Sequence, residues 1–176
     1  WHTPDLEVVS AYVDQFPDND LSRQRSEEFG FPIYESVADA LRCGGDQLAV
    51  DAVLLIGEHG DYPKSEFGQT KYPRYELFKQ ITDVFRSDGR SVPVFNDKHF
   101  STMWDEAKWM FDKSRELDFP LYGGSSIPFY YRKPEIEIDI DTPIKASVVA
   151  GGSRNAGGLF HAVDVLQCFV ERRKGG

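Results

Sequence analysis

Acidic, basic and histidine side chains follow two apolar stretches of the sequence, residues 50–56 and 92–95, at the point where each stretch ends. Near-continuous apolar stretches are typical of buried parallel strands, and in open α/β sheets ligands bind beyond the carboxyl ends of such strands. We therefore expect the two polar groups to meet in one site. Their members are Glu58, His59 and Asp61 after the first stretch, and Asp97, Lys98 and His99 after the second.

Three chemical interpretations fit these polar groups. The simplest is that they cap strands and hydrogen-bond within loops. A second is a metal site, because histidine and carboxylate ligands suit zinc, manganese or iron, although the sequence has neither cysteine pairs nor HExxH spacing. The third is acid–base chemistry, with Lys98 as a proton donor whose pKa the neighbouring carboxylates tune. The residues by themselves leave all three open.

His161 follows a glycine-rich turn, residues 151–158, near the start of a predicted helix. A lone histidine on an apolar helix face is often a core residue, whereas one at a helix start beside a turn can act as an acid or base, and both interpretations stay open. The glycines themselves could bind a phosphate at the helix N-terminus. The turn lacks the Lys-Ser/Thr of a P-loop, and no parallel strand follows it, which disfavours that role.

Asp14 ends the first predicted strand. In dinucleotide-binding folds an acid at the end of the second strand hydrogen-bonds a ribose hydroxyl, and the alternative is an ordinary turn or helix cap. The glycine-rich loop that precedes this position in such folds would lie N-terminal to Trp1.

Aromatic and basic side chains gather in the predicted loops and could bind a sugar or a carboxylated substrate by stacking and bidentate contacts. Alternatively they pack on their own domain. They are Tyr62, Tyr72, Arg74, Tyr130, Tyr131 and Arg132.

The elements that must position these residues alternate as strand, helix, helix, strand, helix, strand, helix, strand. This alternation predicts an α/β fold with parallel pairing and right-handed crossovers. The predicted strands are 7–14, 50–56, 92–95 and 119–123, with a brief extended piece at 31–34, and the predicted helices are 21–29, 36–43, 74–86 and 102–117.

The pattern changes after Pro134. Residues 135–141 alternate strictly between acidic and apolar side chains, which is typical of a half-exposed antiparallel strand, and 144–150 is its expected partner. A helix is predicted over 159–173. We therefore divide the chain into residues 1–133 and residues 134–176, the second being the start of an α+β domain with antiparallel strands.

Composition sets limits on the class of protein. In 176 residues, 40% are hydrophobic, enough to bury a core, and the formal charge of −9 disfavours a nucleic-acid partner. No apolar stretch approaches the roughly 20 residues of a membrane span. Cys43 and Cys168 have no CxxC spacing and are expected to be free thiols of a reducing compartment, the cytoplasm. Both ends of the sequence lie close to predicted elements, so we expect a segment of a longer protein.

Seven segments along the chain are similar, in order, to the pattern of one family. They are 13–14, 37–41, 50–53, 97–99, 105–107, 123–132 and 157–164. On these segments the chain resembles the Gfo/Idh/MocA family, which includes glucose–fructose oxidoreductase and inositol dehydrogenase. It looks like an atypical bacterial branch, seen from the family's second strand onward.

In this resemblance Lys98 stands at the lysine of the family's Glu-Lys-Pro motif, which lies beside the nicotinamide and the substrate, and His161 stands at its catalytic histidine. The chain departs from the family at three places. His99 replaces the proline of the motif, Gly157 stands at the usual catalytic aspartate, and Glu58-His59 replaces the usual proline after that strand.

The resemblance implies a Rossmann-like domain that binds NAD or NADP, an oxidoreductase acting on a small molecule such as a sugar, polyol or related hydroxy compound, and a homo-oligomer formed through the C-terminal sheet. The alternatives are a metal-assisted lyase, isomerase or hydrolase that reuses the fold, and a non-catalytic binding or sensor protein. The implied catalytic residues are Lys98, His161 and Asp97, the cofactor residues Asp14, Gly57 and Glu58, and the substrate residues His59, His99, Arg132 and Tyr131; no metal ligand is assigned.

Overall fold

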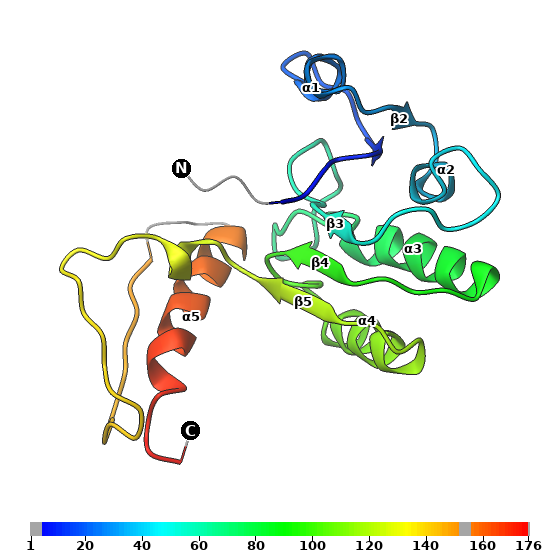
Figure 1. The fold of residues 1–176 in the computed structure, drawn as a ribbon. Helices are drawn as coiled ribbons and strands as arrows, with labels where there is room; N and C mark the ends of the chain where they lie inside the picture. The colour runs from blue at the N-terminus through cyan, green and yellow to red at the C-terminus, as the bar shows by residue number, and fades with distance from the viewer. Residues whose placement is uncertain (1–4, 152–155, 176) are drawn as a thin grey trace.

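The computed structural model describes residues 5–151 and 156–175, and within them the chain forms a mixed α/β fold (Figure 1). The elements in chain order are β1 (Ala11–Tyr12), α1 (Ser22–Phe29), β2 (Ile33–Tyr34), α2 (Val37–Leu41), β3 (Val53–Leu55), α3 (Arg74–Asp88), β4 (Val94–Asp97), α4 (Trp104–Glu116), β5 (Leu121–Gly124), the 3₁₀ helix η1 (Ile127–Phe129) and α5 (Ala156–Val170).

All ladders between the named strands are parallel, which confirms the predicted α/β class. β1 pairs with β2 in one sheet, and β3, β4 and β5 form the other in that order. In the larger sheet Val53 is opposite Val94, and Val94 is opposite Leu121. The first strand is much shorter than the predicted 7–14, because β1 has a partner only at two residues and the apolar side chains before it are exposed.

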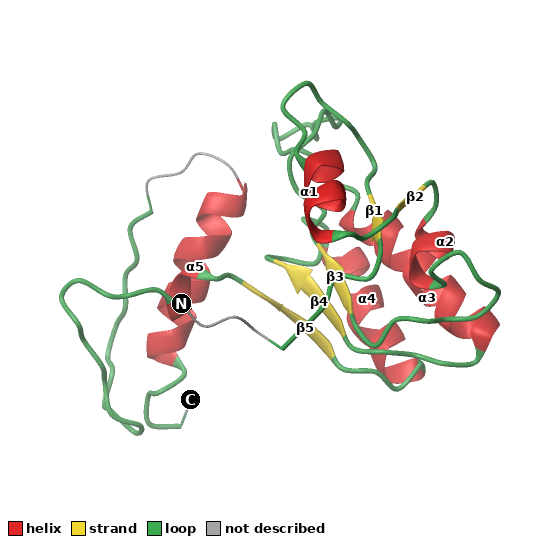
Figure 2. Cartoon of the chain, turned by 45° about the horizontal axis from the view of Figure 1, so that its top comes forward, coloured by secondary structure: helices red, strands yellow, loops and turns green. Residues whose placement is uncertain are grey.

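The core lies between the larger sheet and helices α3 and α4 (Figure 2). Phe78 and Phe85 of α3 and Met110 of α4 are completely or almost completely buried against Val94 of β4. Helix α3 ends at Gly89, whose φ of 64° is the left-handed conformation that glycine adopts at a helix C-terminus. This packing fixes the direction of β3 and β4, and with it the position of the loops at their carboxyl ends.

The opposite face of this sheet carries apolar side chains in register. Leu54, Phe95 and Tyr122 lie side by side on neighbouring strands, and all three are exposed. No helix in the described part of the chain covers them, so the sheet is packed on one face only.

Residues 135–150, predicted as two antiparallel strands, contain no strand in the structure. The one bridge in this stretch joins Thr142 to Arg173 and is parallel. Ile136, Ile140 and Val148 are exposed. A lone two-stranded ribbon is marginally stable, and alternation alone cannot supply the further strands or the packing surface that such a ribbon needs.

Helix α5 starts at Ala156, three residues before the predicted start, and ends at Val170. It packs against η1, and its first turns approach the carboxyl edge of the larger sheet (Figure 1). Residues 152–155 of the predicted glycine-rich turn lie outside the described residues. Cys43 and Cys168 are free, as predicted. Within residues 5–151 and 156–175, the helices are all too short or too polar to cross a membrane.

Candidate functional site

The loops after β3 and β4 bring an ammonium group between two carboxylates. Lys98 Nζ donates hydrogen bonds to Glu58 Oε2 and to Asp97 Oδ2, the latter at 2.7 Å. The side chains of Lys98 and Glu58 are only 14% and 12% exposed. The two polar groups of the sequence therefore meet at the carboxyl edge of the parallel sheet, where parallel strands place residues that follow them.

The environment of Lys98 keeps its side chain charged. Burial by itself would lower the pKa of Lys98, but the hydrogen bonds and charges of Asp97 and Glu58 outweigh burial and raise that pKa. An ammonium group has three N–H donors. Since the two carboxylates engage two of them, one N–H of Lys98 is left to donate to a ligand.

The backbone at Lys98 is left-handed, with a φ of 65°. The buried side chain of Asn96 holds this conformation, because its Nδ2 donates to the carbonyl oxygens of Asp97 at 3.2 Å and His99 at 3.0 Å. The Lys98 N–H also donates to the carbonyl of Gly124 in β5 at 3.0 Å. Unusual backbone conformations of this kind concentrate at functional sites, where the surrounding structure must enforce them.

Arg74, the first residue of α3, lies beside this cluster and is only 2% exposed. Its Nη1 is 3.3 Å from Nε2 of His99. Its stem passes over Gly57, where a Cβ atom would come within 3.0 Å of Arg74 Cγ. Gly57 therefore serves the packing of Arg74 in this structure.

His99 is neutral at neutral pH. Burial, followed by the positive charge of Arg74, lowers the pKa of His99 to about 4. A neutral imidazole has one acceptor nitrogen. Since Arg74 Nη1 is a donor, Nε2 accepts its hydrogen bond and Nδ1 carries the proton.

Helix α5 brings His161 to the same edge of the sheet. His161 Nδ1 is 2.5 Å from the hydroxyl oxygen of Ser125, which directly follows β5. Asp164, one turn along the helix, accepts a hydrogen bond from the Ser125 N–H at 2.9 Å. The Phe160 ring lies 5.5 Å from the His99 ring. The backbone N–H of Lys98 donates to Gly124, and the next residue, Ser125, is hydrogen-bonded to His161. These two hydrogen bonds connect His161 to the Lys98 cluster.

Asp14 lies elsewhere, two residues after the end of β1. It accepts hydrogen bonds from the hydroxyls of Tyr12 at 2.9 Å and Tyr62 at 2.8 Å. Burial and the Asp14 carboxylate raise the pKa of both tyrosines. Asp14 borders a hollow of about 460 Å³ lined by Tyr12, Val13, Asp14, Phe16, Arg23, Ile33, Tyr34 and Glu35.

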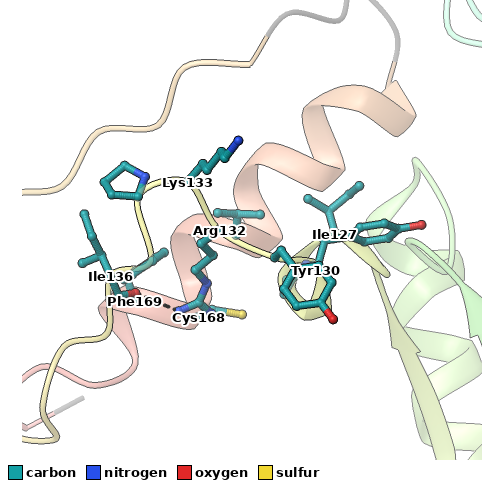
Figure 3. A pocket seen from close by; sticks show the side chains of 11 residues that line it. Ile127, Tyr130, Arg132, Lys133, Ile136, Cys168 and Phe169 are labelled. Carbon is teal, nitrogen blue, oxygen red and sulfur yellow. Dashed lines mark hydrogen bonds between the residues drawn. The ribbon is translucent and has the colours of Figure 1, made fainter. Parts of the chain in front are cut away.

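Tyr131 and Arg132 are not brought to Lys98. They lie at a separate groove of about 360 Å³, between η1, the segment after it and the second half of α5 (Figure 3). Arg132 donates to the carbonyl of Ile136 at 3.1 Å and to Glu137 at 2.6 Å, and its guanidinium lies 4.8 Å from the centre of the Phe169 ring. Tyr131 is fully exposed. His59, with a φ of 66°, is exposed on the loop after β3.

Sequence reasoning missed three residues that shape this edge, Asn96, Ser125 and Asp164, and it placed Arg74 only within a general group of loop residues. Asn96 carries a usable sequence signal, because the two-residue period of a strand places this polar side chain on the same face as the apolar Val94. Both side chains are fully buried in the structure. Ser125 and Asp164 lie in segments 123–132 and 157–164 of the family resemblance, but local spacing gave neither a role, since 39 residues separate the two partners of their hydrogen bond.

Among the described residues, no three His, Cys, Asp or Glu side chains gather closely enough to hold a metal ion. The chain was also compared with models of protein families and with curated proteins, and it matches none of them. The resemblance to the Gfo/Idh/MocA family therefore stays a prediction.

Proposed function

We propose that this protein is an NAD(P)-dependent oxidoreductase acting on a hydroxy compound such as a sugar, a polyol or a related molecule, with Lys98 at the reacting oxygen. The observation that carries the proposal is the Lys98 ammonium group. Two carboxylates fix it at the carboxyl edge of a parallel sheet, and it keeps one N–H to donate.

The chain's own residues would act on the substrate as follows. Lys98, kept protonated by Glu58 and Asp97, donates a hydrogen bond to the substrate oxygen and stabilises negative charge that develops on it. His161, oriented through Nδ1 by Ser125, exchanges the substrate's hydroxyl proton at Nε2. The acceptor for the substrate's hydride is supplied by NAD(P) when it is bound.

The hollow beside Asp14 fits the adenosine end of such a cofactor. Each oxygen of Asp14 already accepts one tyrosine hydrogen bond and retains acceptor capacity for a ribose hydroxyl. Phe16 and Tyr34 give the hollow aromatic walls. Gly57 and Glu58, the other two predicted cofactor residues, are engaged by Arg74 and Lys98 instead.

The strand order supports a Rossmann-like fold as part of this proposal. Both sheets are parallel, and one further strand between β1 and β3 would join them into a single sheet of the doubly wound kind. We also extend the proposal to an antiparallel sheet and homo-oligomer contact in the C-terminal part. Its support is the exposure of Ile136 and Ile140, in a stretch that forms no strand within this single chain.

Calorimetric titration of the full-length protein with NAD⁺ and NADP⁺, followed by turnover assays with a panel of polyols and sugars, tests the proposal. We expect one nucleotide to bind, and Lys98→Gln to lower kcat by about 10²- to 10³-fold, the usual cost of removing a preorganised donor. Absence of binding by both nucleotides would overturn it. Stoichiometric metal in protein purified without chelator would favour the metal-assisted alternative, and ligand binding without turnover would favour a sensor.

A further inference from the structure

Arg74 holds a buried charge, and two of its guanidinium nitrogens have no hydrogen-bond acceptor among the described residues. These nitrogens are Nε and Nη2, and among the described residues the other buried side-chain polar atoms without a partner are Asn96 Oδ1 and His99 Nδ1. All four atoms belong to neighbouring residues around Lys98. Buried polar groups are hydrogen-bonded in the great majority of cases, and an unpaired buried charge is more costly still. The cluster therefore lacks a polar partner.

The unpaired groups have the geometry of a carboxylate receptor. Nε–H and Nη2–H lie parallel on one edge of the guanidinium plane, the fork that grips both oxygens of a carboxylate. The third nitrogen, Nη1, is engaged by His99. Gly57 and the start of α3 fix the stem, so the orientation of the fork is set before any ligand arrives.

We propose that Arg74 anchors a carboxylate of the substrate, which makes the substrate a hydroxy acid, such as a uronic or aldonic acid, in place of a neutral sugar or polyol. This inference rests on the proposed function, because it names the substrate class of the same site. Glu58 and Asp97 accept hydrogen bonds from Lys98, and neither accepts one from Nε or Nη2 of Arg74, so they do not fill the fork.

The charge balance favours a monoanion over a dianionic phosphate. The cluster already holds two cations, Arg74 and Lys98, and two carboxylates, Glu58 and Asp97, while His99 is neutral, so a monoanion adds one negative charge to it and a dianionic phosphate adds two. Nε and Nη2 of Arg74 are the pair of unpaired donors in this cluster, and together they can bind the two oxygens of one carboxylate. A phosphate would bring further oxygens and a second negative charge into the same enclosed place.

We place the ligand's entry at the loop of residues 57–73, which ends directly before Arg74. The ring of Tyr72 lies 5.1 Å from Arg74 Cζ. The same ring packs edge-on against the ring of Tyr62, with 6.0 Å between the ring centres. Nε and Nη2 are buried in this structure, so binding requires neighbouring side chains, Tyr72 among them, to move aside. Loops of this length in compact domains are commonly functional.

Binding of matched acid and neutral probes to the full chain, measured by calorimetry without nicotinamide, tests the inference. The probes are D-glucuronate with D-glucose, and D-gluconate with D-sorbitol. We expect at least one acid to bind about tenfold or more tightly than its neutral partner, and Arg74→Lys to weaken that acid by about ten- to a hundredfold, the usual range for charge-assisted hydrogen bonds. Arg86→Gln, an exposed position on the same helix, is the matched control and leaves affinity unchanged.

Arg74→Gln removes the charge and abolishes the preference for the acid, and Arg74→Lys carries the test if the glutamine variant fails to fold. Equal binding of acids and neutral partners, no binding by either acid, or an undiminished preference in the Arg74 variants would overturn the inference. Because no nicotinamide is present, these results are independent of the proposed cofactor. Oxidation of neutral polyols by the wild type and Arg74→Lys alike would sink the inference and leave the proposed function standing.

Discussion

Two arginines of this chain sit in contrasting surroundings. Arg132, at the groove beside α5, shares an exposed ion pair with Glu137 and covers the Phe169 ring. Arg74, at the carboxyl edge of the sheet, is buried with two of its three guanidinium nitrogens unpaired. Both were grouped together from the sequence as candidates for substrate binding. The difference shows that pairing and burial, more than residue type, separate a charge available to a ligand from one already satisfied by its own chain.

The largest expected difference between the two regions is in the free energy of unfolding that their ion pairs contribute. Lys98→Ala leaves Glu58 and Asp97 together in a mostly buried place, so we expect the free energy of unfolding to fall by about 2–4 kcal/mol. Arg132→Gln breaks an exposed pair and should cost less than about 1 kcal/mol. Urea unfolding measures both. Equal losses in the two variants would show that burial does not distinguish the regions.

Asn96→Ala removes the amide that holds the turn after β4. We expect a loss of about 2–3 kcal/mol in the free energy of unfolding, because the variant leaves buried carbonyl oxygens without their donor. The matched control is Asn19→Ala, an exposed asparagine in the turn before α1, for which we expect little change. Chemical denaturation of both variants gives the comparison, and an unchanged Asn96→Ala protein would refute the positioning role.

The lowered pKa of His99 makes the free energy of unfolding depend on pH. This pKa is about 4 in the folded chain and about 6.5 when unfolded, so between these values the unfolded state binds more protons. Stability therefore falls as the pH is lowered from about 6.5 towards 4, by about 2 kcal/mol from this group. Denaturation midpoints of the wild type and His99→Gln across this range provide the test. The variant should show the shallower dependence, and identical slopes would contradict the assignment.

Gly57→Ala produces the smallest change. The added methyl group would lie 3.0 Å from Arg74 Cγ, so the arginine must shift by a few tenths of an ångström. We expect a loss of about 1 kcal/mol in the free energy of unfolding. Affinity for the carboxylate probes should fall as well, because the fork is displaced. Gly68→Ala is a control for the same substitution in open space, although its φ of 76° adds backbone strain of its own.

The sequence was sufficient to predict the parallel α/β class, helices α3 and α4, and the meeting of Glu58 with Lys98. These features follow from local periodicity and from the rule that parallel strands end at one edge. The short β1 and the absence of strands in 135–150 were not foreseeable, because alternation marks a half-exposed stretch without saying whether a partner lies beside it.

The details of the site depend on contacts between distant parts of the chain. Ser125 meets His161 across 36 residues, and Tyr62 meets Asp14 across 48, so no local spacing reveals either pair. The burial of Arg74 follows from the packing of α3 on the sheet, and its unpaired edge is visible only once every neighbouring acceptor is placed. Residue type suggested what the site could do, and packing decided which side chains are placed to do it.

The left-handed backbone at residue 98 has a consequence for protein engineering. Glycine adopts this conformation without penalty, whereas lysine incurs roughly 1–2 kcal/mol. Lys98→Gly would relax the main chain while deleting the cation, so its shortfall in stability should be smaller than that of Lys98→Ala. The difference in the free energy of unfolding between these two variants measures the backbone strain at residue 98, which the native chain accepts in order to place an ammonium group there.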